Sequence, residues 1–228
     1  MKRRHRLILV AAVVAAVAAA AGLIALSATS ADTAKRKDEA VPAASLPVAQ
    51  HGIILGSSSA RVTLVEFADL QCPYCGEFSR LALPEIVRDY VATGRVRIVF
   101  QGLAFLGRDS RTALRAVLAA GLQNHAWDML EGLYRAQGAE NGGWVTRRTL
   151  RDVGAGIDGL NTARMFRDMN SRAVARQMRD AKAMATQARV NGTPSFFVGP
   201  SGGMLQAVRL SSIGAAALRP SLDTALSG

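Results

Sequence analysis

The chain has 228 residues, of which 50% are hydrophobic and 20% charged, and its formal net charge is +11. From residue 41 onward, 21 basic residues stand against 14 acidic ones, and the arginines alternate with acids along the expected helices. No basic run is interleaved with aromatic residues, so the sequence gives no support to a nucleic-acid partner. Attraction to anionic lipid headgroups stays open for a domain held close to a membrane.

Residues 1–31 predict a signal anchor. A basic cluster precedes an uncharged apolar run of 22 residues, 7–28. At about 1.5 Å per residue this run makes a helix of roughly 33 Å, enough to cross a hydrocarbon core of about 30 Å. It is longer than the roughly 7–15 apolar residues of a cleaved signal, which favours an uncleaved single-pass anchor. The run is mostly alanine and ends in small residues, so cleavage as a signal peptide is the alternative.

The basic cluster before this span predicts that the N-terminus is cytoplasmic and that the body lies on the extracytoplasmic side of the membrane. Cleavage of the helix would make the body secreted or periplasmic instead. Residues 32–50 combine mixed charges with no periodic apolar pattern, which predicts a flexible linker. Residues 51–228 contain no internal repeat and fit one domain with a sizeable core.

The first predicted strand covers residues 61–70, "RVTLVEFADL", which are rich in apolar and β-branched side chains. Such a run is typical of a strand covered on both faces, in a sheet flanked by helices. A helix is predicted to begin at Pro73, because proline is best tolerated at the first helical position. Apolar residues recur at helical spacing as far as Tyr90. Pro84 predicts a kink in this helix and Gly94 predicts its end.

The second predicted strand covers residues 95–100. The order strand, helix, strand makes the two strands parallel, as in a βαβ unit of an α/β fold. A long helical tract follows over about 110–182, interrupted at "QNH", "QGAENGG" and "GAGIDG". Two short strands around a Gly-Pro-Ser-Gly-Gly turn come next, and a final helical segment is expected after Ser212.

The only two cysteines form the motif "CPYC", Cys72 to Cys75, between the first strand and the helix. At the N-terminus of a helix, free backbone N–H groups and the helix dipole lower a thiol pKa from about 8.5 to roughly 3.5–7.5. The spacing brings Cys75 within disulfide reach of Cys72, with its sulfur further beneath the surface. We therefore predict a redox pair in which Cys72 attacks or is attacked and Cys75 resolves.

Two other interpretations of the cysteine pair are weaker. A structural disulfide that closes so short a loop removes little entropy from the unfolded chain. A metal site needs about four ligands, and the sequence has no second CxxC motif. The three histidines, His5, His51 and His125, lie far apart, and nothing supports His51 or His125 completing a site across a dimer. We expect neither a metal nor a bound cofactor.

An acidic residue, Glu66, lies six positions before Cys72 in the apolar strand. A buried acid is unfavourable unless it is paired or protonated, so its presence requires a reason. Beneath the sulfurs, with a pKa raised by burial, Glu66 would take or deliver the proton of Cys75. The alternative is that it reaches an arginine at the sheet margin. Asp69, nearer the strand end, is expected to be solvated or capping, with no chemical role.

The segments "LVEFADLQCPYC" and "VNGTPSFFV", with the long helical stretch between them, resemble the DsbA-like thioredoxin family of exported thiol:disulfide oxidoreductases. The resemblance runs from about residue 51 to the C-terminus. It implies a thioredoxin fold with a helical domain inserted at about 108–185. The family's buried acid maps onto Glu66. Two departures concern local detail: "QGLAFLG" lacks an acid or proline often found there, and Pro220 interrupts the last predicted helix.

The resemblance also implies a substrate-binding segment at Thr193 and Pro194. The Thr193–Pro194 peptide bond would be cis and would face Cys72, and Thr193 would offer backbone hydrogen bonds to a substrate strand. The Pro73-Tyr74 dipeptide within the motif would tune the reduction potential. Tyr74 would also form part of an apolar lip that meets unfolded chains.

Together these patterns predict a membrane-tethered or secreted thiol:disulfide oxidoreductase that acts on exported cysteine-containing proteins, most simply as a dithiol oxidase. The resemblance implies reoxidation by a membrane redox partner of the quinone-linked kind. Two alternatives remain open. The same site would serve a disulfide reductase or isomerase, and an anchored assembly factor would use the fold without catalysis.

Overall fold

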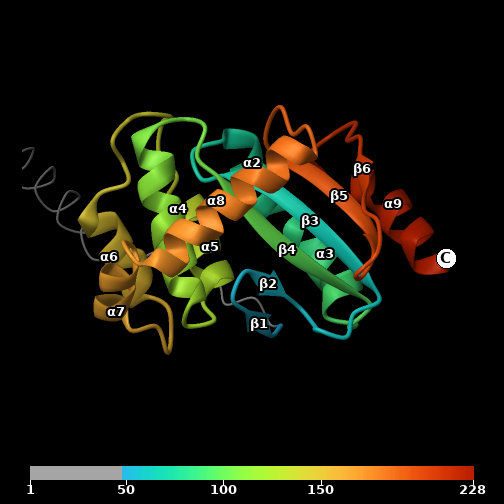
Figure 1. Ribbon diagram of the computed structural model, residues 1–228, viewed down its shortest axis with the longest axis horizontal. Coiled ribbons are helices and arrows are strands. Elements are labelled where there is room, and N and C mark those ends of the chain that lie inside the picture. Colours follow the sequence, from blue (N-terminus) through green and yellow to red (C-terminus); the bar gives the residue numbers. More distant parts are fainter. Residues whose placement is uncertain (1–47) are drawn as a thin grey trace, which may run out of the picture. The chain divides into compact units, whose positions relative to one another are not determined.

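The computed structural model describes residues 48–228, so the predicted N-terminal anchor and nearly all of the predicted linker lie outside the described residues. Within 48–228, the strands form one mixed sheet in the order β1-β2-β4-β3-β5-β6 (Figure 1). The strands are β1 (Gln50–His51), β2 (Ile54–Leu55), β3 (Val62–Asp69), β4 (Val96–Leu103), β5 (Ser195–Pro200) and β6 (Gln206–Val208). No helix within this range is both long and apolar enough to cross a membrane.

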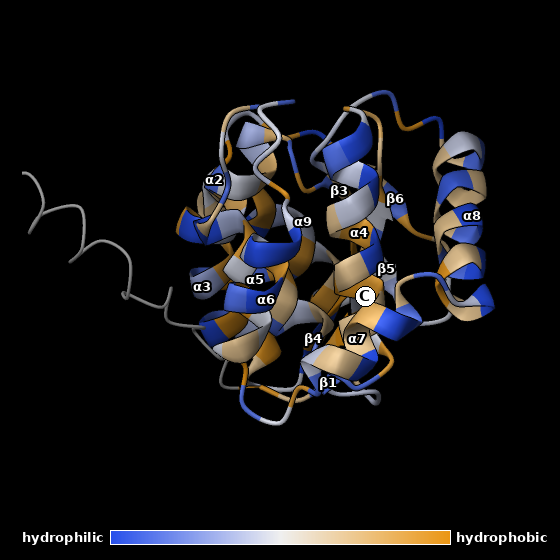
Figure 2. Cartoon of the chain, turned by 90° about the vertical axis from the view of Figure 1, so that its left-hand side faces the viewer, coloured by the Kyte–Doolittle hydropathy of each residue, from blue (hydrophilic) through white to orange (hydrophobic). Residues whose placement is uncertain are grey.

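Helices on both sides of the sheet complete this α/β fold. They are α2 (Pro73–Leu81), α3 (Leu83–Ile86), the π-helix η1 (Val87–Val91), α4 (Arg108–Gly121), α5 (Ala126–Arg135), α6 (Arg147–Ala155), α7 (Thr162–Asp168), α8 (Arg172–Gln187) and α9 (Ala215–Ser227). Figure 2 shows α8 on one side of the sheet and α2, α3 and α5 on the other. Helices α4 to α8 stand between β4 and β5 in the chain.

The central strand is β3, which pairs parallel with β4 and antiparallel with β5. All eight of its residues are buried, which confirms the prediction of a strand covered on both faces. Leu64 and Ala68 belong to the larger apolar cluster, and Val65 and Phe67 belong to a smaller cluster that includes Ala185 of α8. Because side chains alternate along a strand, Glu66 points to the face that the CPYC helix covers.

The segment after the CPYC motif differs from the single kinked helix that was predicted. Helix α2 ends at Leu81, and α3 begins at Leu83 with Pro84 as its second residue. Proline fits there because its missing N–H would have no partner within the helix. The predicted interruption thus falls at Ala82, two residues before Pro84, and Ala82 itself keeps helical dihedral angles (φ −97°, ψ −42°). The final turn is the π-helix η1, and Gly94 follows with φ +73°.

The helices between β4 and β5 are interrupted at the three predicted places and also at a fourth, residues 169–171. The fourth break separates α7 from α8, and Ser171 caps the new helix by accepting a hydrogen bond from Val174 N. Thr146 and Asn161 cap α6 and α7 in the same way. Such side chains satisfy backbone N–H groups that a helix start leaves free, which is why they mark the breaks.

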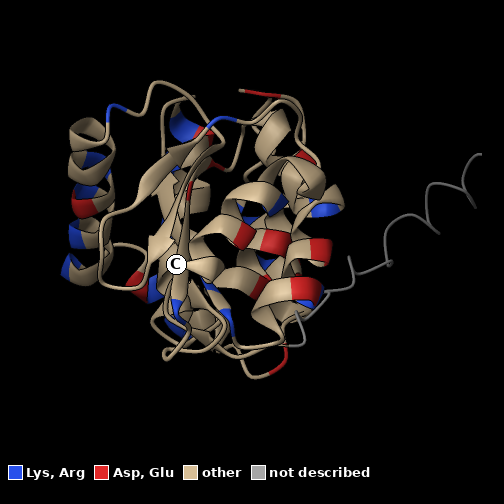
Figure 3. Cartoon of the chain, turned by 90° about the vertical axis from the view of Figure 1, so that its right-hand side faces the viewer, with Lys and Arg blue, Asp and Glu red and all other residues tan. Residues whose placement is uncertain are grey.

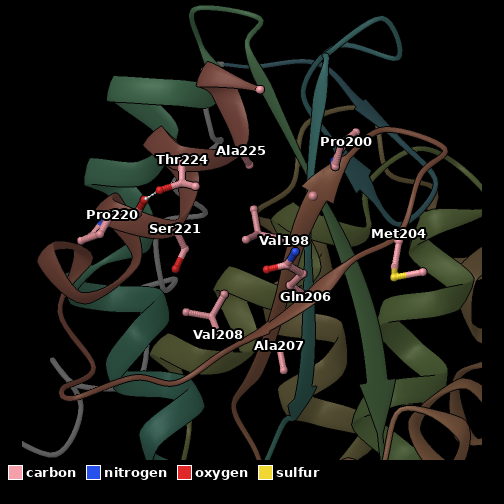
Figure 4. A pocket seen from close by; sticks show the side chains of 12 residues that line it. Val198, Pro200, Met204, Gln206, Ala207, Val208, Pro220, Ser221, Thr224 and Ala225 are labelled. Atoms are coloured by element: carbon pink, nitrogen blue, oxygen red, sulfur yellow. Dashed lines mark hydrogen bonds between the residues drawn. The ribbon is translucent and has the colours of Figure 1, made fainter.

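The C-terminal part contains the predicted hairpin, because β5 and β6 pair antiparallel. Helix α9 continues through Pro220 even though proline removes one helical hydrogen bond. A pocket of about 380 Å³ lies between this hairpin and α9 (Figure 4), with Val198 and Gln206 on one wall and Ser221 and Thr224 on the other. None of the residues lining this pocket belongs to the predicted site.

Candidate active site

The end of β3 delivers Cys72 to the start of α2. Cys72 occupies the N-cap with an extended backbone (φ −67°, ψ 119°), and Pro73 follows at the start of the helix. A backbone hydrogen bond of 3.0 Å from Cys72 N to Asp69 O forms the turn between strand and helix. Both cysteines are free thiols, and Cys75 is completely buried while Cys72 is 5% exposed.

The segment containing Thr193 lies directly against Cys72, although 121 residues separate them in the chain. In its thiol form, Cys72 Sγ donates a hydrogen bond to the carbonyl oxygen of Thr193 at 3.1 Å. The Thr193–Pro194 peptide bond is cis, as the resemblance implies. The hydroxyl of Ser195 closes the loop by donating to Gly192 O at 2.7 Å.

The two thiols have opposite proton affinities. The pKa of Cys72 is lowered to about 6, chiefly by a hydrogen bond with the Cys75 side chain. Burial opposes this shift, and the side chain of Thr193 and the backbone N–H groups of Cys75 and Tyr74 add to it. The pKa of Cys75 is raised well above its ordinary value, mainly by burial. The predicted contribution of helix N–H groups is therefore present, but it is smaller than that of the partner thiol. The pair consists of one thiolate and one protonated thiol near neutral pH.

Glu66 is buried in β3, 2% exposed, and not at the sheet margin. Its pKa is raised to about 8, mainly by burial and then by the charges of Glu131 and Cys72. Protonated Glu66 and Cys75 therefore coexist with the thiolate of Cys72. A thiolate beside a second, buried thiol is the kind of pair that thiol–disulfide exchange uses.

Comparisons with known proteins agree with this geometry. A family model described as thioredoxin matches residues 49–201. The chain is 27% identical over 147 residues to the probable disulfide bond formation protein D of Bacillus anthracis, covering 63% of this chain and 68% of that protein. The chain belongs to the DsbA-like thioredoxin family. It is a thioredoxin-like protein disulfide oxidoreductase.

Two solved structures show the same fold. The crystal structure of oxidised BdbD from Bacillus subtilis superposes with a TM-score of 0.67 at 23% identity, covering 79% of this chain and 98% of that one. A thioredoxin-like oxidoreductase from Silicibacter pomeroyi has a TM-score of 0.61 at 30% identity, covering 77% of this chain and 92% of that one. The predicted thioredoxin-like fold is thus confirmed for the part of the chain that the structure describes.

Asp69 was expected to be solvated or capping, and in this DsbA-like chain it is not solvated but does accept from backbone N–H groups. It is completely buried, and its carboxylate accepts hydrogen bonds from Ser110 Oγ at 2.6 Å and Gln71 N at 2.9 Å. The backbone N–H groups of Phe105 and Leu106 donate to its other oxygen. Solvation was the wrong expectation because the start of α4 and the preceding loop cover the end of β3. The carboxylate fastens that loop to the strand carrying the motif.

Gln71 extends this buried network and was missed from the sequence. Its Nε2 donates to Leu106 O at 2.9 Å and Ser110 Oγ at 3.0 Å, and its Oε1 accepts from Asn141 N at 2.7 Å. One side chain adjacent to Cys72 therefore binds two loops of the helical tract. Its position beside the motif was the only available signal, since its partners lie 35 to 70 residues away.

Gln137, in the loop after α5, contacts the motif from the other side. Its Nε2 donates to Leu70 O at 2.9 Å and to Cys72 O at 3.1 Å. A Cβ on Gly76 would lie 2.4 Å from Gln137 Oε1, so the absence of a side chain there makes room for this contact. No local pattern in the sequence points to Gln137.

The surface around the site contains exposed aromatic rings. Tyr74 is 59% exposed within the motif, and Phe105, in the loop fastened by Asp69, is 53% exposed. Among residues 48–228, no group of three histidine, cysteine or acidic side chains is arranged to hold a metal ion. His125 Nδ1 instead lies 3.0 Å from Asp128 Oδ2.

Proposed function

We propose that this DsbA-like protein is a dithiol oxidase that forms disulfides in exported cysteine-containing proteins. The observation that carries the proposal is the opposite shift of the two thiols, with the pKa of Cys72 near 6 and that of Cys75 raised well above its ordinary value. A stabilised thiolate favours the reduced enzyme and so makes the disulfide form a stronger oxidant. Each pKa unit corresponds to about 1.4 kcal/mol, or about 30 mV of reduction potential.

In the proposed reaction, a client thiolate attacks Cys72 Sγ of the Cys72–Cys75 disulfide. The S–S bond breaks, and Cys75 leaves and takes a proton from Glu66. A second client thiolate then attacks the client sulfur of the mixed disulfide and releases Cys72 as a thiolate. Two electrons pass from client to enzyme. The two client thiols release two protons: one balances the reprotonation of Glu66, which gave its proton to Cys75, and the other stays in solvent.

Thr193 and Pro194 are proposed to bind the client backbone beside the reacting sulfur. Support comes from the 3.1 Å contact between Cys72 Sγ and Thr193 O, which puts a backbone polar group within reach of any chain attached to Cys72. Pro73 fixes the start of the helix, and the exposed Tyr74 offers an apolar surface to an unfolded client.

The proposed location is the extracytoplasmic side of the membrane, with the N-terminal helix as anchor. A secreted or periplasmic form after signal cleavage is the alternative. An oxidase must be reoxidised, and we propose a membrane redox partner of the quinone-linked kind. The predicted anchor supports this arrangement, because it would keep the enzyme at the membrane surface.

Redox equilibration with glutathione tests the direction of electron flow. We expect a potential nearer the roughly −120 mV of strong oxidases than the roughly −270 mV of thioredoxin, together with oxidation of a reduced model protein. Cys72→Ala should abolish this oxidation, because the attacked sulfur is lost. A potential close to that of thioredoxin would favour the reductase or isomerase alternative.

Trapping in cells tests the clients. Cys75→Ala lacks the resolving thiol, so mixed disulfides on Cys72 should accumulate. We expect exported proteins containing cysteine among the trapped partners. Recovery of an electron-donating membrane protein without clients would contradict the oxidase.

A further inference from the structure

Glu131, on α5, is a second buried acid close enough to Glu66 to act on it, and it was not anticipated from the sequence. It is 4% exposed, and Ser79 Oγ donates a hydrogen bond of 2.8 Å to its Oε1. Ser79 follows Cys75 by four residues on α2, so the two share one face of the helix, one turn apart. The charge of Glu131 is also the largest charge acting on Glu66. Two buried carboxyl groups therefore lie within reach of each other's charge, one from β3 and one from α5.

Helix α5 continues this arrangement toward solvent. His125 is the N-cap residue of α5, and Asp128 and Glu131, three residues apart within the helix, are neighbours on one of its faces. His125 Nδ1 lies 3.0 Å from Asp128 Oδ2, and the His125 side chain is 22% exposed. Asp128 is 5% exposed, and its Oδ1 has no hydrogen-bond partner among the described residues. A buried carboxylate oxygen without a partner is unfavourable unless it meets a proton or an ordered water.

The two ends of helix α5 lie at different distances from the CPYC motif. Just after the C-terminal end of α5, Gln137 contacts Cys72 O. His125 caps the other end of the helix, ten residues before Arg135. At 1.5 Å per residue, His125 is about 15 Å along the helix from the motif. A client joined to Cys72 and lying on Thr193 would therefore leave the His125 end uncovered.

We propose that Glu131, Asp128 and His125 form a proton-transfer row that links buried Glu66 to solvent while a client covers Cys72. The inference rests on the proposed role of Glu66 as the proton donor to Cys75. When the active-site disulfide breaks, Cys75 takes the Glu66 proton, and Glu66 regains a proton from Glu131. Glu131 is reprotonated from solvent, with Asp128 and His125 passing the proton along. Glu131 is thus a positioning residue that acts through Glu66 and does not touch the sulfurs.

The surroundings of Glu131 suit this role. Burial, the largest influence, and the charge of Asp128 raise its pKa, whereas Ser79, Arg135 and Arg80 lower it, and the result is about 7. Glu66 faces it from β3 with a pKa of about 8. The two acids therefore exchange protons at similar affinity, which is the condition for efficient proton transfer near neutral pH.

The test compares proton-dependent rates across variants. Glu131→Gln keeps the shape and can still accept from Ser79, but it cannot carry a proton. Stopped-flow mixing of the oxidised enzyme with a client dithiol should show the reprotonation of Glu66, followed by the infrared band of its carboxyl group, slowed about 100-fold at pH 7, at the lower end of the range for proton-transfer catalysis. Asp128→Asn should slow the same step in the same direction. Asp152→Asn, an exposed acid on α6, is the matched control and should behave as wild type.

A pH profile distinguishes proton transfer from a structural role. Ser79→Ala removes one group that lowers the Glu131 pKa, so the pH profile of Glu66 reprotonation should shift to higher pH. Ser79→Ala also provides a test of the proposal if Glu131→Gln does not fold. If the wild type oxidises clients but all three variants have unchanged rates and pH profiles, the proposed proton-transfer row is wrong. The proposed function would then still stand. A wild type that oxidises no client would instead overturn the proposed function itself.

Discussion

The thiolate of Cys72 is stabilised chiefly by its neighbour in the motif. Cys75 donates to it, and the same contact together with burial keeps the proton on Cys75. Glu66, protonated below about pH 8, lies in the same cluster. At the scale of single residues, the protonation states of these three groups therefore depend on one another. Changing one group should shift the pKa values of the other two.

Cys75→Ala should raise the pKa of Cys72 above about 6, because the largest stabilising hydrogen bond is lost. Titration of the ultraviolet absorbance of the thiolate measures the midpoint. Cys75→Ser keeps a donor and should titrate closer to wild type. A midpoint that stays near 6 in the alanine variant would mean that the backbone N–H groups dominate.

Glu66→Gln should weaken the dependence of stability on pH. Burial raises the pKa of Glu66 from 4.5 to about 8, so the folded state holds a proton that the unfolded chain releases. Its stabilising contribution is complete below about pH 4.5 and is lost as pH rises through about 8. The free energy of unfolding of the wild type should therefore fall across this window by up to about 1.4 kcal/mol per pH unit more than that of the variant. Denaturant unfolding at pH 5, 6.5 and 8 measures the difference, and parallel pH curves would contradict it.

At the scale of elements, the start of α2 is held from two sides. The network of Asp69 and Gln71 fastens the loop before α4, and Gln137 brings the end of α5 onto Cys72 O. The hydrogen bond between Ser79 and Glu131 joins α2 to α5 one turn further along. The helical tract therefore determines where the reacting sulfur sits, in addition to covering the sheet.

Gly76→Ala should loosen this contact. The new Cβ would lie 2.4 Å from Gln137 Oε1 and displace the amide that donates to Leu70 O and Cys72 O. Because that amide ends a flexible side chain, we expect a loss of about 1–3 kcal/mol in the free energy of unfolding. A double-mutant cycle with Gln137→Ala is the control, since the alanine at 76 should cost much less in that background. Strictly additive losses would show that the two residues are not coupled.

At the scale of the whole molecule, a sheet covered on both faces carries the motif at the end of its central strand. Basic and acidic side chains are mixed along α8 (Figure 3), as the alternation in the sequence predicts. At this scale the redox state of the motif should also change the stability of the fold.

The reduced protein should be more stable to heat than the oxidised protein at pH 7. The lowered pKa of Cys72 stabilises the folded reduced form, a contribution complete above about pH 9 and lost as pH falls through about 6. The oxidised form has no thiolate and lacks this contribution. Thermal unfolding of both forms at pH 7 and pH 5 measures the gap, which should narrow at pH 5. A gap of constant size would point to a cause other than the thiolate.

The sequence by itself determined the features that depend on neighbouring residues: the buried strand, the helix start at Pro73, the CPYC pair and the buried acid Glu66 beside it. Periodicity and helix-start chemistry act over a few residues, so they can be read without a structure. The segment "VNGTPSFFV" was recognised only through its resemblance to a family.

Tertiary structure alone decided the rest. It brought Thr193 against Cys72 across 121 residues, buried Asp69 beneath a loop, and carried Glu131 and Gln137 under the motif. These contacts join segments whose separation in the chain leaves no local pattern. They exist because the long helical tract folds back over the end of the central strand, and only the packing of that tract fixes which side chains meet there.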